Sequence, residues 1–286
     1  MQSKTNIKII EMTTKKLNLL KQISICFIIF MSGLTGLAQD DGYLAHRVKP
    51  GDLMYLDGQG NECFVDYRQW NQDAPLGTPI GVVFYSYYGV EPYVVDDQPG
   101  WHGWVVAIDE SAKLAWAPQN TVCYTNCVAF YEVDGVVTPY NPNRNQKDLA
   151  WADTCGWQNT YRFLEFLYNG QHRTLSASTS PVFHYIFSTM NGVADFTVKP
   201  SMHRTSWFLP SYGQVRMLYS QLGCVNSALK ACGGTLFRLA NSWYSSTEVG
   251  EENKQAAWSV TGYGFSNTNP GWLKNQERNV RAVRIF

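Results

Sequence analysis

The chain has 286 residues, of which 45% are hydrophobic and 14% aromatic, with 23 basic and 23 acidic groups. This composition can bury a full core, which excludes an intrinsically disordered protein. A neutral chain with 16% charged residues also lacks the basic surface of nucleic-acid-binding proteins, so we expect no nucleic-acid partner. The neutrality is an average, because residues 1–38 hold five lysines and one glutamate and leave the rest net acidic.

The first 38 residues have the pattern of a secretory signal peptide. Lysines precede an apolar run over 23–37, and Gly36 and Ala38 place small residues at the −3 and −1 positions of a cleavage site. We therefore expect export to the periplasm, the cell surface or the medium. A retained anchor is the alternative, but the run is short for a span. No later stretch has the roughly 18 consecutive apolar residues of a transmembrane helix.

The cysteine count fits an oxidising compartment. Six cysteines follow the predicted leader: Cys63, Cys123, Cys127, Cys155, Cys224 and Cys232. An even number favours disulfides, with Cys123–Cys127 and Cys224–Cys232 as the local candidates, although spacing does not choose among the pairings and buried thiols are the alternative. The sequence has no paired short-spaced ligands of a zinc site. We therefore expect no metal and no cofactor.

Residues 39–140 are predicted to be β-rich. Apolar runs at 52–56 and 63–67 flank an Asp-Gly-Gln-Gly turn, which is a strong hairpin signal. The β-branched and aromatic runs 80–88 and 103–109 predict two further strands that lie next to each other. The turn-forming stretch 140–145 marks the seam with the rest of the chain.

Two helices are predicted after the seam. Residues 159–160 are expected to cap the first, which should end at Asn-Gly 169–170. Ser211, with Gln214 three residues later, predicts a capping box for the second, which should end before Gly223.

The C-terminal part is expected to close a sheet. Residues 256–260 and 280–286 predict strands, the last with apolar residues alternating with arginine. Residues 261–274 between them are rich in Gly, Asn, Ser and aromatics, which is typical of an exposed loop. The elements together predict an α+β fold of small, irregular antiparallel sheets with two helices.

Several motifs in this half occur in a recognisable order: 153–160 (DTCGWQNT), 207–211 (WFLPS), 233–234 (GG), 243–248 (WYSSTE), 257–258 (AW) and 280–286 (VRAVRIF). They resemble a family of exported Bacteroidetes proteins, related to the Fibrobacter-type major paralogous domain family. The resemblance covers residues 150–286 and, loosely, the hairpin at 51–67. It implies a C-type lectin-like fold. We expect residues 39–286 to form one such domain, with 39–140 enlarging a core at 141–286; a separate N-terminal domain is the alternative.

Most motif residues are expected to hold the fold together. Tryptophans suit the centre of a small core, proline fixes a helix start, and paired glycines permit a turn. The two arginines of the last strand, three positions apart, should point to opposite faces. This structural set is Trp207, Pro210, Gly233, Gly234, Trp258, Arg281 and Arg284.

The resemblance implies that function lies in the loops between residues 243 and 274, where lectin-like folds bind their partners. A similar subset of the family is the variable proteins of diversity-generating retroelements. Exposed aromatics offer contact area and asparagines offer adaptable hydrogen bonds, so we expect a protein or glycan ligand. Ordinary packing of these side chains is the alternative. The candidate ligand-binding residues are Tyr244, Asn253, Tyr263, Phe265, Asn267, Asn269 and Trp272.

Other functions fit the sequence less well. Calcium-dependent sugar binding needs converging carboxylates, and only incomplete motifs occur at 91–93, 98–100 and 151–153. The related formylglycine-generating oxidases need a reactive cysteine pair near the C-terminus, where no cysteine follows Cys232. Hydrolase and phosphate-loop motifs are missing, so we expect no enzyme, with a Cys155–His184 pair as the remaining catalytic alternative. A structural or adhesive cell-surface component is the third class.

Overall fold

The structure, a computed structural model, describes residues 47–89, 100–118, 130–133, 136–139, 150–170, 173–238, 240–248, 256–261 and 272–286. Contacts divide the chain into two units, 1–47 and 48–286. All the described residues except Arg47 belong to the second unit. The predicted signal peptide, its cleavage site and the seam at 140–145 lie outside the described residues.

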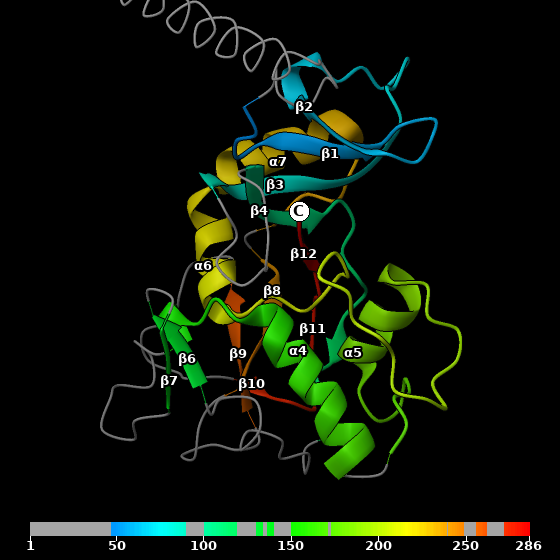
Figure 1. Ribbon diagram of the computed structural model, residues 1–286, viewed down its shortest axis with the longest axis vertical. Helices are drawn as coiled ribbons and strands as arrows, with labels where there is room; N and C mark the ends of the chain where they lie inside the picture. The colour runs from blue at the N-terminus through cyan, green and yellow to red at the C-terminus, as the bar shows by residue number, and fades with distance from the viewer. Residues whose placement is uncertain are drawn as a thin grey trace, which may run out of the picture. The chain divides into compact units, whose positions relative to one another are not determined.

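A five-stranded antiparallel sheet occupies the upper part of the second unit as drawn in Figure 1. Its order is β12-β4-β3-β1-β2. The predicted hairpin is confirmed, since β1 (Asp52–Leu56) pairs with β2 (Glu62–Asp66). The predicted neighbours are also confirmed as β3 (Thr78–Gly89) and β4 (Gly100–Ala107). The last strand, β12 (Val283–Ile285), is shorter than predicted and pairs with β4, so the two halves of the chain share one sheet.

Two consecutive helices pack on one face of this sheet. Helix α6 (Tyr212–Ser220) begins with the predicted capping box of Ser211 and Gln214. Helix α7 (Leu222–Cys232) was not predicted, because we interpreted Gly223 as the end of the preceding helix, whereas it lies in the first turn of α7. A core cluster joins the two layers; it includes Leu53, Val82, Phe84, Val106, Leu218, Val225 and Leu229.

A second helical layer packs on the opposite face. It contains α4 (Gly156–Glu165), the π-helical turn η2 (Phe166–Gly170), α5 (Pro181–Tyr185) and the π-helical turn η3 (Ile186–Met190). Their core cluster includes Val83, Val105, Ala107, Phe163, Leu164, Phe183, Ile186 and Phe187. The prediction that residues 159–160 cap the first helix was wrong, because the helix begins three residues earlier and Asn159 instead reaches a buried carboxylate.

Several small elements complete the fold. A three-stranded sheet of order β10-β9-β8 contains β8 (Ser242–Glu248), the predicted strand β9 (Ala256–Thr261) and β10 (Trp272–Leu273). Two-stranded sheets pair β5 (Leu114–Ala115) with β11 (Glu277–Arg278), and β6 (Phe130–Val133) with β7 (Val136–Pro139). A 3-10 turn, η1 (Tyr67–Gln69), follows β2. The molecule is thus an α+β protein of small antiparallel sheets and few helices.

Candidate functional site

One end of the three-stranded sheet holds both ends of one predicted binding segment and one end of the other. Ala257 of β9 pairs with Glu248 of β8 on one side and with Trp272 of β10 on the other. Segment 249–255 therefore begins and ends at this end of the strands, and segment 262–271 returns to it from Thr261, which pairs with Ser242 at the opposite end. The candidates in these segments, Asn253, Tyr263, Phe265, Asn267 and Asn269, lie outside the described residues, and only the backbone of Trp272 is described.

Tyr244 does not lie on an exposed loop. The candidate sits within β8, its side chain is fully buried, and its hydroxyl lies 2.7 Å from the Leu273 carbonyl and 2.6 Å from the Gln276 carbonyl. Burial raises the pKa of this phenol above its ordinary value. The placement of Tyr244 on a binding loop was wrong, because residues 242–248 form a strand whose Tyr244 side chain is buried, and its hydroxyl instead contacts the chain that follows β10.

The same strand is fastened to the core by buried polar contacts. The Ser245 hydroxyl donates to the Trp258 carbonyl at 2.8 Å, and the Trp116 indole N–H donates to the Ser245 carbonyl at 3.0 Å. Lys274, also fully buried, places its ammonium 4.6 Å from the centre of the Trp116 ring, while its carbonyl accepts from the Ala117 amide at 3.1 Å. These contacts give the base of the predicted binding segments little freedom to move.

A buried carboxylate joins the start of α4 to β8. Asp153 accepts hydrogen bonds from the Thr247 hydroxyl at 2.6 Å, the Asn159 amide at 2.9 Å and the Cys155 backbone N–H at 2.8 Å. Burial raises the pKa of Asp153, and these hydrogen bonds oppose the rise. Thr247 in turn accepts from the Tyr212 amide at 2.8 Å, so the first turn of α6 belongs to the same network.

Pro210 and Ser211 complete this network. The Ser211 hydroxyl donates to the Asp153 carbonyl, and Ser211 shares the capping box with Gln214. The Pro210 carbonyl accepts from the Ser246 amide at 2.8 Å. Residues from three of the sequence motifs therefore meet in one buried polar cluster, which connects the helices to the C-terminal sheet.

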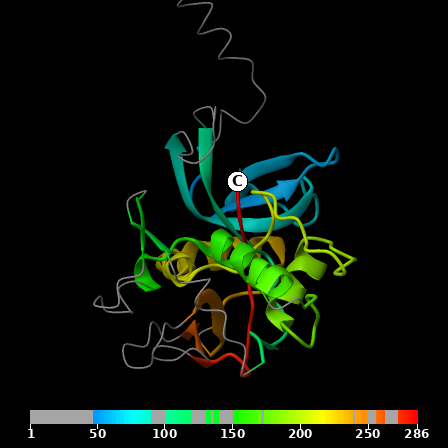
Figure 2. The ribbon, with the colours of Figure 1, turned by 60° about the horizontal axis from the view of Figure 1, so that its bottom comes forward.

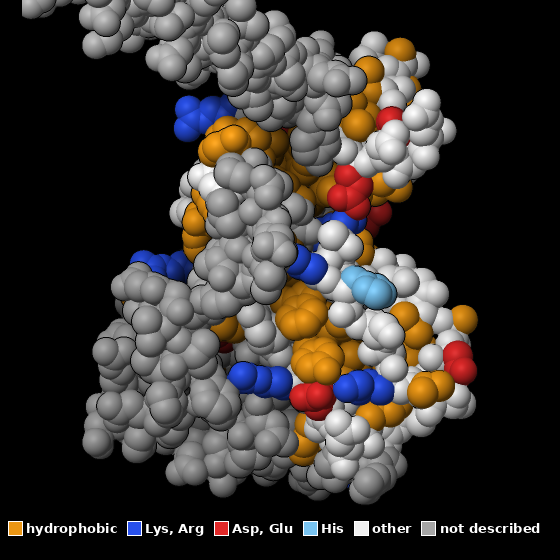
Figure 3. All heavy atoms as spheres, in the orientation of Figure 1, with side chains coloured by type: hydrophobic (Ala, Val, Ile, Leu, Met, Phe, Trp, Pro, Cys, Tyr) orange, Lys and Arg blue, Asp and Glu red, His pale blue; other side chains and the backbone are white. Residues whose placement is uncertain are grey.

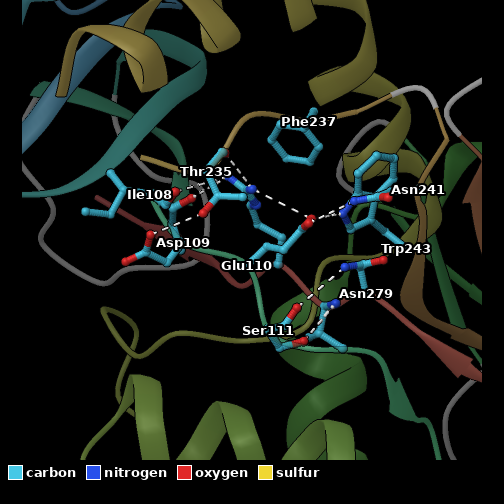
Figure 4. Close-up of polar contacts among 12 residues, drawn as sticks. Ile108, Asp109, Glu110, Ser111, Thr235, Phe237, Asn241, Trp243 and Asn279 are labelled. Carbon is cyan, nitrogen blue, oxygen red and sulfur yellow. Dashed lines mark hydrogen bonds and ion pairs between the residues drawn. The ribbon is translucent and has the colours of Figure 1, made fainter. Parts of the chain in front are cut away.

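A buried ion pair fastens the opposite end of β8 (Figure 4). The Arg281 guanidinium donates to the carbonyls of Ala107, Ile108 and Thr235 at 3.2, 3.3 and 2.7 Å, and it lies 3.7 Å from the Glu110 carboxylate. Only 2% of Arg281 is exposed. The predicted strand 280–286 was too long, because β12 starts after this residue and Arg281 occupies the turn into it.

The partners of Glu110 all come from the segment around β8. Its two carboxylate oxygens accept from the Asn241 amide at 2.9 Å and the Trp243 indole N–H at 2.6 Å. The Phe237 ring lies 4.2 Å from the centre of the Arg281 guanidinium. Desolvation lowers the pKa of Arg281 to about 10, which leaves it a cation at neutral pH. No sequence motif pointed to Glu110, because its partners are more than a hundred residues away in the chain.

The other predicted structural residues are buried or shape turns. Trp207 and Trp258 belong to core clusters, and Arg284 lies 5.6 Å over the Trp207 ring and 2.6 Å from a Glu62 carboxylate oxygen. Gly233 ends α7 with φ +77, a left-handed conformation that favours glycine. A Cβ on Gly234 would lie 2.9 Å from the Ile108 carbonyl, so this contact requires glycine.

The predicted Cys224–Cys232 disulfide was wrong. Both residues lie in α7, where eight residues correspond to a rise of about 12 Å, roughly twice the usual Cα separation of a disulfide. Each thiol donates to a helix carbonyl, Cys224 to Gln221 and Cys232 to Leu229. Burial raises the pKa of both thiols. Cys123 and Cys127 lie outside the described residues.

The surface over α4 carries an aromatic pair. Figure 3 shows hydrophobic side chains gathered over this helix beside basic and acidic ones. The rings of Trp157 and Tyr161 stack with centroids 5.6 Å apart and planes 6° apart. The Lys199 ammonium lies 4.9 Å from the Tyr161 ring centre and 3.5 Å from the Glu165 carboxylate. The Lys199 ammonium thus already lies over one ring of the aromatic pair, and we propose no ligand for this pair.

Comparison with known proteins supports a shared fold. No protein-family model matches the sequence, and no curated protein matches it. A fimbrial protein from Bacteroides ovatus ATCC 8483 is similar in structure, with a TM-score of 0.56 and 19% sequence identity. The likeness covers 84% of this chain and 49% of that protein, so this chain spans about half its length.

The described residues contain neither a membrane-spanning helix nor a metal-binding cluster. No helix in the described ranges is long and apolar enough to cross a membrane. Within the same ranges, no group of three or more His, Cys, Asp or Glu side chains could hold a metal ion.

Proposed function

We propose that this protein is an exported, non-catalytic adhesive component of the cell surface, which binds a protein or glycan through segments 249–255 and 262–271. The observation that carries the proposal is the pairing of Ala257 with both Glu248 and Trp272, because it brings both ends of segment 249–255 and one end of segment 262–271 to the same end of a sheet. Binding loops on a rigid scaffold are the usual arrangement of recognition sites. The buried contacts of Tyr244, Ser245 and Thr247 make this base rigid.

The surface location rests on two further observations. The leader pattern at 1–38 indicates export, and the structurally similar protein is a fimbrial protein.

We also propose that the fold is C-type lectin-like, as the motif order implies. If the protein belongs to the diversified subset of this family, a template repeat and a reverse transcriptase should accompany its gene; a complete locus without them contradicts that membership.

The non-catalytic part of the proposal is supported by the state of the thiols. Nucleophilic cysteines have lowered pKa values, whereas burial raises those of Cys224 and Cys232. Native protein treated with a limiting amount of iodoacetamide should therefore show slow labelling of both residues. Rapid, selective labelling of one cysteine would contradict this part of the proposal.

Binding is tested by replacing segment 262–271, and separately 249–255, with Gly-Ser linkers of equal length. Purified wild-type protein should bind components of a printed glycan array or immobilised mucin, and each linker variant should lose the ligands that its segment binds, without a change in melting temperature. The control is Val198→Ser, which alters a side chain that is 68% exposed elsewhere and should leave binding intact. Unchanged binding by both linker variants would overturn the assignment of the site.

A further inference from the structure

The paired ends of β3 and β4 extend beyond the rest of the five-stranded sheet. β1 pairs with β3 only as far as Val82, and β12 pairs with β4 only at residues 104–106. Gly103 still exchanges backbone hydrogen bonds with Phe286, but beyond it residues 87–89 pair only with residues 100–102 among the described strands. Figure 2 shows the two strand ends lying apart from the other strands. We call residues 85–89 and 100–104 the ribbon.

One face of the ribbon carries a continuous row of rings. Tyr85 is opposite Trp104 and Tyr87 is opposite His102, so the four side chains share this face. The ring centroids are 4.7 Å apart for Tyr85–Trp104, 6.0 Å for Tyr85–Tyr87 and 5.5 Å for Tyr87–His102. The planes of these pairs differ by only 30 to 44°. The rings thus form a gently curved surface without edge-to-face pairs.

The row is anchored in the core at one end and is partly exposed along its whole length. Tyr85 and Trp104 pack against the core cluster under α6 and α7, whereas Tyr87 and His102 are not part of it. All four side chains are partly exposed. The next tyrosine, Tyr88, is 57% exposed and points to the other face, where its ring meets Trp101 edge-on. A row of rings anchored in a core offers contact area with little loss of conformational entropy on binding.

The charge of the ribbon limits its partners. No Asp, Glu, Lys or Arg occurs in residues 78–89 or 100–108. Nucleic acids also stack on aromatic platforms, but they require cations for their phosphates. Protein interfaces add arginine and aliphatic side chains to their aromatics, and the ring row has neither. A sugar ring presents an uncharged C–H face for stacking and hydroxyls at its rim, which suit the tyrosine hydroxyls, while His102 Nε2 lies 3.0 Å from the Gly89 carbonyl and fixes the imidazole as a stacking ring.

We propose that this face of the ribbon, centred on Tyr87, binds a neutral carbohydrate. This site goes beyond the function proposed above, because it lies on a different sheet from the C-terminal segments. A variant that loses glycan binding at the ribbon should therefore keep binding through segment 262–271, and a variant that loses binding through this segment should keep binding at the ribbon.

The test compares two adjacent tyrosines of one strand. The full chain with Tyr87→Ser or Tyr88→Ser is applied to a printed array of neutral oligosaccharides, and the best ligand of the wild type is then titrated calorimetrically. We expect Tyr87→Ser to weaken binding about tenfold, as loss of a stacking ring does, and Tyr88→Ser to change it less than about twofold. Tyr87→Phe keeps the ring and should bind within about threefold of the wild type. The variant with a linker at 262–271 should still bind this ligand.

Three results would overturn the proposal. The first is that the wild type binds no neutral oligosaccharide, and the second is that both serine variants lose binding equally. The third is binding that depends on Tyr87 but only to a protein ligand. If Tyr87→Ser does not fold, Tyr87→Leu keeps apolar bulk without a ring and gives the same comparison. Melting temperatures of the two serine variants, which each remove one cross-strand ring pair, serve as the folding control.

Discussion

The hydroxyl of Thr247 donates to the carboxylate of Asp153 at 2.6 Å and joins two motifs that lie 94 residues apart in the sequence. The contact is fully buried and couples the helix layer to the sheet that presents segments 249–255 and 262–271. The stability of the proposed binding base should therefore depend on this hydroxyl.

Thr247→Val should destabilise the protein by about 2 kcal/mol, because it leaves the buried Asp153 carboxylate and the Tyr212 amide each without one partner. Urea unfolding measures the loss. The matched control is Thr197→Val, which removes an exposed hydroxyl that donates to Asp195 at 2.7 Å and should cost less than about 0.5 kcal/mol. Equal losses of unfolding free energy in the two variants would show that the buried hydroxyl of Thr247 stabilises the protein no more than the exposed one of Thr197.

Asp66 and Asp153 should affect the pH dependence of stability in opposite directions. Hydrogen bonds from Arg68 hold the pKa of Asp66 below its ordinary value of 3.8, so its contribution is present above that pH and is lost as the pH falls. Burial raises the pKa of Asp153, so its contribution is present at low pH and is lost as the pH rises through the raised value.

Melting temperatures between pH 6 and pH 3 test these signs. Relative to the wild type, Asp66→Asn should lose less stability on acidification, and Asp153→Asn should lose more. The comparison uses the slope of the melting temperature against pH, so a constant change in stability from the altered hydrogen bonds of each asparagine does not affect it. Slopes that change in the same direction would contradict the assignment for one of the two carboxyls.

Arg281→Met should be strongly destabilising, by about 3–5 kcal/mol, because it leaves Glu110 buried without its cation. The double variant Arg281→Met/Glu110→Gln should recover part of this loss, since it removes the uncompensated charge. Arg284→Met is the control, because its partner Glu62 is 36% exposed and can be solvated. Chemical denaturation of these proteins, the wild type and the single variant Glu110→Gln gives the comparison, and additive losses at 281 and 110 would exclude coupling.

Residues 141–286 expressed alone should not fold cooperatively. β12 finds its partner in β4, and Arg281 donates to carbonyls at the end of β4, so the shorter chain lacks both. Thermal unfolding followed by circular dichroism distinguishes the outcomes. A sharp, reversible transition in the fragment would show that the residues before 141 form a separate domain.

Cys224 and Cys232 should both be alkylated after the protein is purified without reductant and denatured, because the geometry of α7 prevents a disulfide between them. Mass spectrometry of the α7 peptide reads the result directly. A peptide 2 Da lighter than the reduced form, with neither cysteine modified, would contradict the helix.

The parts of the fold that could be predicted from sequence are those fixed by local chemistry. The Asp-Gly turn at 57–60, the strands 80–88 and 103–109, and the Ser211–Gln214 capping box all depend on residues close in the chain. Gly223 was wrongly predicted to mark the end of the helical region, because glycine is tolerated in the first turn of a helix as well as after its last turn.

The candidate site depends on contacts that sequence periodicity does not reveal. Tyr244 was interpreted as a loop residue because it lies in the stretch that the family resemblance assigns to binding loops. It instead belongs to β8, which pairs with β9, and its side chain is buried. Asp153 was noted only in a family motif and in an incomplete calcium motif, and Glu110 was not noted at all. Both are buried acids satisfied by donors far away in the chain, which only the tertiary structure brings together.

Adherence of whole cells tests the central claim most directly. Cells that display the wild-type protein, and cells that display the variant with a Gly-Ser linker at 262–271, are compared on a mucin-coated surface at equal display levels. The account predicts that wild-type cells adhere and that cells with the linker variant do not. Equal adherence of both, with both proteins folded, would contradict it.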